Sequence, residues 1–288
     1  MSQYFFNRVA ALTIGKPNTL GGLDVGIKIQ TPLRIAFEIT KAEFSMGNIG
    51  KITVNNLSDA TRKIIRQDRG LIAILEAGYA DAGGPQLIFS GDIWDVSHNV
   101  EKPEVETTIT VIDGHNAIKQ KKIAISYAKD TPIAKIIQDA AKSLGLPIDA
   151  TFNYLQLPTA NLDGTLAFTG PAATWLTKLC DDNGLQWSVQ NGSVKICALT
   201  QTDNLPPLSS FLIGSPKRLF KNELSASLND FSGYEFKALL MPKCAPYSRV
   251  TIQSRELPTP VTLRVAEVKH TGDSHGAEWS TTVRARDL

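Results

Sequence analysis

The 288-residue sequence is poor in cysteine and in long apolar runs. Its cysteines are odd in number and form no CxxC pair, which argues against a disulfide framework and a zinc site; they are Cys180, Cys197 and Cys244. No stretch approaches the roughly 18 apolar residues that span a bilayer. The start, MSQYFFNRVAALTIG, is partly apolar but, unlike a signal peptide, has no basic n-region followed by a long apolar run. We therefore expect a soluble protein, not inserted in a membrane and assembled in a reducing cytoplasm.

Sequence signatures of catalysis are also lacking. No serine lies in a GxSxG motif, and no cysteine has a histidine near it in the sequence. Gly21 and Gly22 lack the spacing of a phosphate-binding loop. The formal net charge is only +2, and the basic run at 119–122 (KQKK) is too short for a nucleic-acid-binding arm, so a solvated turn is expected there. We expect no enzyme, no catalytic, cofactor-binding or metal-binding residue, and no cofactor.

Two histidines and an aspartate near the end of the sequence are the first weak candidate for a site. His270, Asp273 and His275 lie in the run HTGDSH. Two histidines and one carboxylate without a third ligand in a fixed pattern fit a catalytic zinc site poorly. Gly272, Asp273 and Ser274 are typical of a turn, so we favour a solvated hairpin loop.

Paired carboxylates are the second weak candidate, because two of them can catalyse glycoside hydrolysis. Asp92 and Asp95 flank Trp94. In a regular strand, residues three apart point to opposite faces, so this pair is not expected to converge. Asp181 and Asp182 precede an Asn-Gly pair, where residues that favour turns are expected in any case.

Three aromatic residues in the middle of the chain form the third candidate. Phe168, Trp175 and Trp187 could make a platform for a ligand. The apolar residues around Trp175 recur at helical spacing, which favours a role in a hydrophobic core instead.

The first 125 residues are typical of β-structure. Runs rich in β-forming residues, with apolar and polar residues alternating at 33–44, predict strands at 5–14, 33–44, 51–55, 71–79, 87–97 and 105–112. One helix is expected at 60–66, with Ser58 as N-cap and with Ile64 and Ile65 facing inward. Several strands at this spacing indicate a closed or sandwiched antiparallel sheet.

The pattern changes from residue 126. Thr131 as N-cap and Pro132 at the first helical position predict a helix that ends at Gly145. A second helix is predicted from Gly170-Pro171 to Asn183-Gly184, and Asn191-Gly192 predicts a hairpin turn. Strands are then predicted at 233–240, 248–254, 261–270 and 278–285.

These patterns predict a mainly β protein with an α+β insert. The expected domains are a first β-domain at 1–125, the insert at 126–205 and a second β-domain at 206–288. Apolar residues make up 42% of the sequence and charged residues 20%, a composition that can form a packed core.

The order of these segments resembles the baseplate hub proteins of contractile-tailed phages. The run VETTITVIDGHNAIK is followed by DTPIAKIIQDAAKSLGLP, then by GPAATWLTKLCDDNGLQWSVQNGSVKI, and finally by VAEVKHTGDSHGAEWSTTVRA. The sequence is similar in this order to Mu-like and late-control-D-like proteins, which are related to the hub module of type VI secretion spikes. The matching pieces are Thr131-Pro132, the hairpin at Asn191-Gly192 and the segment from His270 to Trp279.

The resemblance implies a structural protein in the baseplate of a virion tail. Its two β-domains would be tail-tube-like barrels or sandwiches. Three copies would form a homotrimeric ring with pseudo-sixfold symmetry between the tail tube protein and the spike protein. Tape measure and wedge proteins are further expected partners, and DNA would pass through the lumen only transiently. Because no β-helix repeat or lysozyme domain is seen, the spike is expected to be a separate chain.

Two alternatives remain open at this point. A tail-associated peptidoglycan hydrolase would depend on the carboxylates Asp92, Asp95, Asp181 and Asp182. A carbohydrate- or protein-binding adaptor would depend on the aromatic residues of the insert.

Overall fold

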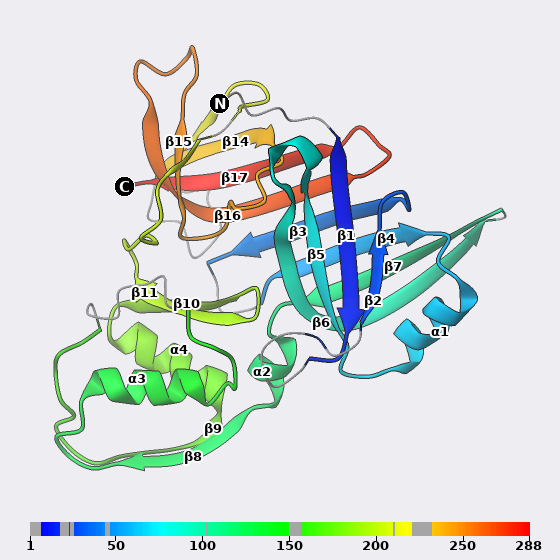
Figure 1. Ribbon diagram of the computed structural model, residues 1–288. Helices are drawn as coiled ribbons and strands as arrows, with labels where there is room; N and C mark the ends of the chain where they lie inside the picture. Colours follow the sequence, from blue (N-terminus) through cyan, green and yellow to red (C-terminus); the bar gives the residue numbers. More distant parts are fainter. Residues whose placement is uncertain are drawn as a thin grey trace. The chain divides into compact units, whose positions relative to one another are not determined.

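The computed structural model describes residues 7–17, 23, 26–43, 47–101, 103–149, 157–209, 211–220 and 232–288. The chain forms two compact units. Unit 1 comprises Met1–Ala42, Asn48–Ile112 and Pro207–Leu288, and unit 2 comprises Glu43–Gly47 and Asp113–Pro206. Unit 1 therefore contains residues from both ends of the sequence (Figure 1).

Unit 1 is built on one sheet, which has 13 strands over the described residues. The strands before unit 2 are β1 (Arg8–Gly15), β2 (Ile27–Gln30), β3 (Ile35–Ala42), β4 (Ile49–Asn55), β5 (Ile72–Tyr79), β6 (Gly84–Glu101) and β7 (Glu104–Ile112). Those after it are β12 (Leu208–Ser209), β13 (Lys217–Leu219), β14 (Gly233–Leu239), β15 (Arg249–Ile252), β16 (Val261–Asp273) and β17 (Trp279–Asp287). The order across the sheet is β13-β14-β17-β16-β3-β4-β7-β6-β5-β1-β2; off this path, β15 pairs with β16, and β12 pairs with β15.

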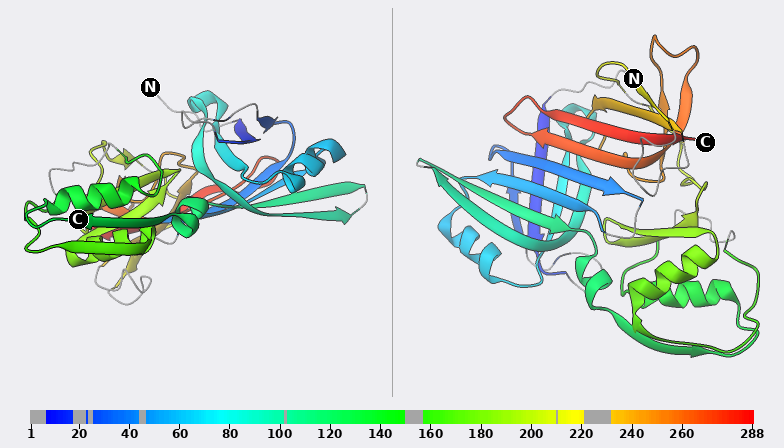
Figure 2. Two further views of the ribbon diagram at one scale, coloured as in Figure 1. Left: turned by 90° about the horizontal axis from the view of Figure 1, so that it is seen from below. Right: turned by 180° about the vertical axis from the view of Figure 1, so that it is seen from behind.

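The sheet bends at β6, which takes part in two layers. Its first half pairs with β5 and its second half with β7, and register shifts occur in both pairings. β1 crosses the layer that contains β4 and β7 (Figures 1 and 2). Apolar side chains of both layers form one buried core, which includes Leu12, Ile52 and Phe89. A strand that bends from one layer into another is typical of orthogonally packed sheets.

The mainly antiparallel β class with an α+β insert is confirmed by this topology. Among the named strands of the described residues, one pair is parallel, β12 with β15. The closed barrel that we considered is not found, because the path of the described strands ends at β2 on one side and at β13 on the other. The run predicted at 5–14 forms β1 from Arg8, while its residues 5 and 6 lie outside the described residues.

Helix α1 (Asp59–Gln67) connects β4 to β5, and the short 3₁₀ helix η1 (Ala80–Ala82) precedes β6. The predicted cap is confirmed, because the Ser58 hydroxyl accepts a hydrogen bond from the Thr61 N–H at 3.2 Å. Of the two isoleucines expected to face inward, Ile65 is buried and Ile64 is exposed. The expectation for Ile64 was wrong because adjacent residues on a helix point about 100° apart.

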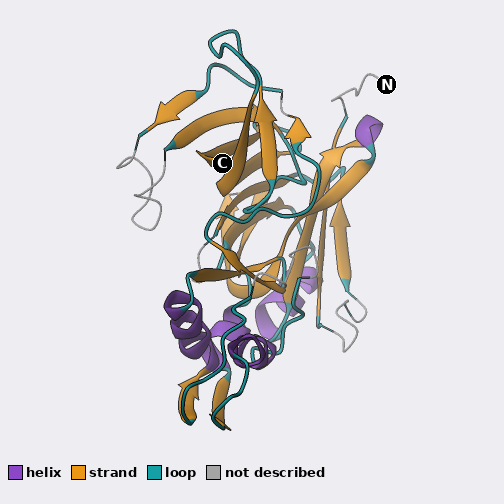
Figure 3. Ribbon diagram, turned by 90° about the vertical axis from the view of Figure 1, so that its left-hand side faces the viewer, coloured by secondary structure: helices purple, strands orange, loops and turns teal. Residues whose placement is uncertain are grey.

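Unit 2 is an α+β structure whose described helices and strands all come from the segment Asp113–Pro206. Its elements are α2 (His115–Gln120), β8 (Lys122–Tyr127), α3 (Ile133–Lys142), β9 (Leu166–Pro171), α4 (Ala172–Asp182), β10 (Leu185–Gln190) and β11 (Ser193–Ala198). β8 pairs with β9, and β10 with β11. Figure 3, coloured by secondary structure, shows that most of the helical residues belong to this unit.

The predicted helices and hairpin of unit 2 are present, with one correction. Thr131 is not the N-cap of α3, because its hydroxyl donates to the Ala128 carbonyl at 2.7 Å and Pro132 occupies the cap position. Asn191 and Gly192 both have positive φ, as a two-residue hairpin of type I′ requires. No helix in the described part of the chain is long and apolar enough to cross a bilayer.

Candidate functional site

The three residues of the weak metal candidate do not come together. His270 is buried within β16, Asp273 is the last residue of that strand, and His275 lies in the exposed turn that follows. Over the described residues, no group of three or more histidine, cysteine, aspartate or glutamate side chains could hold a metal ion. The solvated turn that we expected begins only at Ser274, and the expectation was wrong for His270, Gly272 and Asp273, which belong to β16.

His270 is a neutral structural residue. Its Nδ1 lies 3.0 Å from the Thr281 hydroxyl, and its Nε2 lies 3.1 Å from the Cys244 carbonyl. A carbonyl can only accept, so Nε2 carries the proton and Nδ1 accepts from Thr281. Burial, with the charge of Lys41 as a second cause, lowers the pKa of His270 to about 3. The imidazole is thus uncharged at physiological pH and links β16 to β17 and to the segment before β15.

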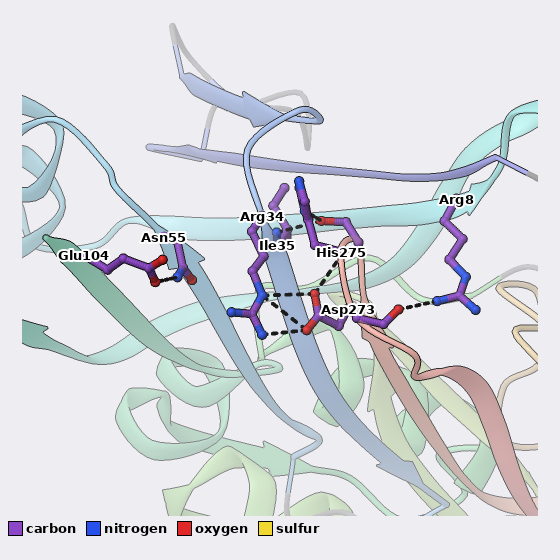
Figure 4. Close-up of polar contacts among 9 residues, drawn as sticks. Arg8, Arg34, Ile35, Asn55, Glu104, Asp273 and His275 are labelled. Carbon is purple, nitrogen blue, oxygen red and sulfur yellow. Dashed lines mark hydrogen bonds and ion pairs between the residues drawn. The ribbon is translucent and has the colours of Figure 1, made fainter. Parts of the chain in front are cut away.

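The turn after β16 is fastened to the start of β3 (Figure 4). Ser274 is hydrogen-bonded in both directions with Ile35: its N–H donates to the Ile35 carbonyl, and its hydroxyl accepts from the Ile35 N–H, each at 3.0 Å. The Arg34 guanidinium donates to the Asp273 carboxylate, with Nη2–Oδ2 at 2.8 Å. This hydrogen bond lowers the pKa of Asp273 and raises that of Arg34. Arg8 donates to the Gly276 carbonyl at 2.6 Å.

Trp279, at the start of β17, packs into the core formed by residues of β1 to β7. Trp279 is buried and makes edge-to-face contacts with Phe37, at 5.5 Å between ring centroids, and with Tyr79, at 6.5 Å. Gly272 leaves room for this cluster, since a Cβ there would lie 2.3 Å from the Phe37 ring. We call β3, β16 and the turn 274–278 the seam, because they join the early and late strands of unit 1.

The sheet face that points away from the cores carries opposite charges in pairs. Across the seam, Lys269 lies 2.8 Å from Glu38. Farther along the same face, Arg284 lies 2.7 Å from Glu235 and also contacts Glu267 at 3.5 Å. The neighbours of these residues in the strands, among them Ile39, Val268 and Val283, are buried, so the alternation along each strand assigns the charges to the outer face.

The structure corrects the argument about Asp92 and Asp95. Trp94 is an extra residue at a register shift in β6, so Asp92 lies opposite Ile112 and Asp95 opposite Thr110. Ile112 and Thr110 share a face of β7, and therefore the two aspartates share a face as well. Asp95 is exposed on this face, and the side chain of Trp94 is exposed as well.

Other sequence candidates are structural or solvated. Trp175 and Trp187 are buried in the core of unit 2, and the Phe168 ring stacks on Trp175 at 4.6 Å. Asp181 and Asp182 are exposed at the end of α4, as expected. The lysines of the run 119–122 are exposed, although the run belongs to the end of α2 and the start of β8. Gly21 and Gly22 lie outside the described residues.

A buried carboxylate that the sequence did not single out holds the hairpin of unit 2. Asp113 accepts hydrogen bonds from the backbone N–H groups of Asn191 at 2.6 Å and Gly192 at 2.8 Å. In the sequence, Asp113 indicates only a turn before Gly114. Neither this contact nor the seam could be found by periodicity, because each joins residues far apart in the chain.

Comparisons with known proteins give consistent matches. The model of one family, described as baseplate hub gp41, matches residues 12–197. The fold is similar to a 43 kDa tail protein of prophage MuSo2 from Shewanella oneidensis, with a TM-score of 0.66, 10% identity and coverage of 98% of this chain and 97% of that one. A tail protein from Neisseria meningitidis MC58 has the same TM-score and coverage at 11% identity.

A third similar structure comes from a secretion system. The c3393 protein of E. coli is described as a component of the type VI secretion system with structural similarity to the T4 phage tail proteins gp27 and gp5. Its TM-score is 0.60 at 10% identity, with coverage of 89% of this chain and 74% of that one. Among curated proteins, none matches the sequence significantly.

Proposed function

This chain belongs to the baseplate hub gp41 family, and we propose that it joins a tail tube to a central spike as one subunit of a homotrimeric ring. The resemblance to baseplate hub proteins seen in the sequence is thereby confirmed. The chain is a structural, hub-like protein of the kind found in phage tails and type VI secretion systems. The ring, its channel and its neighbours are the parts that we propose.

The seam is the observation that carries the proposal. β3 pairs with β16 over seven residue pairs, from Ala42 with Glu267 to Ala36 with Asp273, and makes the early and late strands of unit 1 one sheet. We interpret these two sets of strands as two tube-like halves, in line with the predicted domains 1–125 and 206–288, with 126–205 as the insert. Three copies would then present six halves and could match a sixfold tube above and a threefold spike below.

The outer face of the sheet is suited to line a channel for DNA. Cations that are free to contact phosphates bind DNA by releasing its counterions. Here Lys269 and Arg284 are engaged by carboxylates of the same face. A lining of this kind lets a polyanion pass without holding it.

A structural role without catalysis is the second part of the proposal. Asp92 and Asp95 share an open face, Asp181 and Asp182 are turn residues, and the aromatic residues of unit 2 are packed in its core. The carbohydrate-binding adaptor therefore loses the aromatic residues on which it depended, and the hydrolase is left with Asp92 and Asp95. Incubation of the pure protein with peptidoglycan should release no soluble fragments, whereas their release, and its loss in Asp92→Asn, would support the hydrolase.

The neighbours of the ring follow from this role. We expect contacts with the tail tube protein and the spike protein, and further contacts with tape measure and wedge proteins. Assembly in the host cytoplasm and a final place in the tail baseplate complete the proposal.

The oligomeric state tests the proposal directly. The purified chain, alone at high concentration and mixed with its spike protein, should give the mass of a trimer by light scattering. Electron micrographs of the same samples should show threefold rings. A chain that stays monomeric under both conditions would contradict the proposed ring.

A further inference from the structure

The β6–β7 hairpin extends beyond the strand next to it. β4 pairs with β7 as far as Asn55 with Glu106, whereas β6 and β7 continue to pair as far as Glu101 with Glu104. Figure 1 shows the two strands projecting past their neighbours, with α1 beside them. The end of this hairpin is therefore open to a partner on both faces.

Helix α1 places positively charged side chains beside one face of the hairpin. A hollow of about 460 Å³ lies between α1 and His98 of β6, and the side chains that line it are Arg62, Lys63, Arg66, Gln67 and His98. Arg62 is paired with Asp59. Lys63 and Arg66 are exposed and form no ion pair with any residue that the structure describes. We call this the basic hollow.

The opposite face of the hairpin carries negatively charged side chains. A second hollow, of about 360 Å³, is lined by Arg34, Asn55, Asn99, Pro103, Glu101, Glu104 and Glu106. Its arginine is already paired with Asp273. Glu101 and Glu104 accept hydrogen bonds from the side-chain amides of Asn99 and Asn55, both at 3.1 Å. These amides are neutral, so they do not cancel the negative charges of the two carboxylates. We call this the acidic hollow.

Strand pairing fixes the two hollows on opposite faces. His98 lies opposite Thr107, whose side chain is buried on the core side. Glu106, the residue before Thr107, and its partner Asn99 therefore point to the other side. A twofold contact of either face with itself would bring like charges together, which is unfavourable. A head-to-tail contact brings opposite charges together at each junction. Such contacts close into a ring when the rotation from one copy to the next is a whole fraction of 360°.

We propose that the acidic hollow of one copy docks on the basic hollow of the next copy. The inference rests on the proposed ring and adds the surface that orients its subunits. The occupant is a second copy because one chain carries both complementary charges, the positive ones on α1 and the negative ones at the end of the β6–β7 hairpin. Both hollows are solvent-exposed, so this contact weakens as salt screens the charges.

Charge reversal tests the pairing. Lys63→Glu with Arg66→Glu makes both faces acidic, and Glu101→Lys with Glu106→Lys makes both basic. Each double variant should weaken self-association by roughly tenfold or more in light scattering, because close interfacial charge pairs are strongly coupled. The variant with all four changes restores opposite charges at each junction and should recover the ring.

A control and a mixing experiment separate the possible outcomes. Lys121→Glu with Lys122→Glu changes the net charge as much as the first variant does, on exposed residues of unit 2, and should leave association unchanged. Circular dichroism checks that every variant is folded. A wild-type chain that stays monomeric with its spike contradicts the proposed function itself. Wild-type rings that resist both reversals, or a fourfold variant that fails to recover, contradict only the docking of the two hollows.

Discussion

Unit 1 and unit 2 are both well packed, but their cores are assembled in different ways. The core of unit 2 comes from the single stretch of chain between Ala117 and Ile196. The first core of unit 1 includes Phe37 and Tyr79 from early strands and Trp279 from β17. Unit 2 can therefore pack as its own stretch folds, whereas unit 1 needs contacts between residues more than 200 positions apart, which cost more chain entropy to form.

The two units also differ in the buried polar group that fastens a hairpin. In unit 1 it is the neutral imidazole of His270, which bonds to a hydroxyl and a carbonyl. In unit 2 it is the carboxylate of Asp113, which bonds to two backbone N–H groups. Acid should therefore affect the stability of the two units differently, and a substitution in one unit should leave the stability of the other unchanged.

The largest effect is expected from Trp279→Ala. Removal of a buried tryptophan costs about 3–5 kcal/mol, which should loosen the first core of unit 1. Hydrogen exchange measured by mass spectrometry should show faster exchange in β3 and β5, with β10 and β11 unchanged. Trp94→Ala, at an exposed tryptophan, is the matched control and should change little. Equal loss of protection in both units would show that they are not independent.

Asp113→Ala should destabilise unit 2 and leave unit 1 unchanged, the reverse of what we expect for Trp279→Ala. Two charge-assisted hydrogen bonds to the turn are lost, and we expect a destabilisation of unit 2 of about 2–3 kcal/mol. Exchange should accelerate in β10 and β11 and stay slow in β3. Asp181→Ala, at an exposed carboxylate of the same unit, is the control. A protected hairpin in Asp113→Ala would show that the turn is held by other contacts.

His270 should make unit 1 sensitive to mild acid. Its pKa is lowered to about 3 in the folded protein, against about 6.5 in an unfolded chain. Its contribution to stability is complete above pH 6.5 and declines as the pH falls toward 3, because only the unfolded chain takes up the proton. The slope is about 1.4 kcal/mol per pH unit, or about 2 kcal/mol between pH 6.5 and pH 5.

Urea unfolding followed across this pH range measures the slope. His270→Gln should be less stable at neutral pH and should lack this slope. His275→Gln, at the histidine of the exposed turn, should keep it. A wild-type protein whose stability is constant from pH 7 to pH 5 would contradict the assignment of a neutral imidazole.

The smallest effect is expected at the ion pair of the seam. The Arg34 side chain is 46% exposed, so Arg34→Ala should cost less than about 1 kcal/mol at pH 7. The pKa of Asp273 is lowered, so the stabilisation by the pair exists above its unfolded value of about 4 and is lost as the pH falls below that. The difference between Arg34→Ala and wild type should thus shrink as the pH falls below about 4. A difference that does not change with pH below this value would show that packing of the arginine is what matters.

The elements formed by local contacts could be predicted from the sequence, and the contacts between distant elements could not. The Asn191-Gly192 turn and the Ser58 cap each depend on a few adjacent residues. The pairing of β3 with β16 depends on complementary faces more than 200 residues apart, and many strands of this sequence have such faces. The joining of early and late strands into one sheet was therefore visible only in the structure.

The candidate surfaces were predicted less well than the fold. The absence of catalytic motifs was informative, but the argument from regular alternation failed at Asp92 and Asp95, because one extra residue at Trp94 reverses it. A bulge leaves no sign in a single sequence. The basic and acidic hollows were missed for a related reason: their residues come from α1, β4, β6 and β7, which become neighbours only once the sheet has formed.

The position of Trp279 in the first core has a consequence for synthesis on the ribosome. By the time Ile112 has been translated, all the buried residues of that core have been made except Leu240 and Trp279. Phe37 and Tyr79 then still lack the tryptophan that packs against them. At about 5–20 residues per second, the wait lasts on the order of ten to thirty seconds, while unit 2 is synthesised and can fold. We expect nascent chains stalled between the two segments to be cleaved readily by protease in the early strands, and to become resistant once Trp279 has emerged.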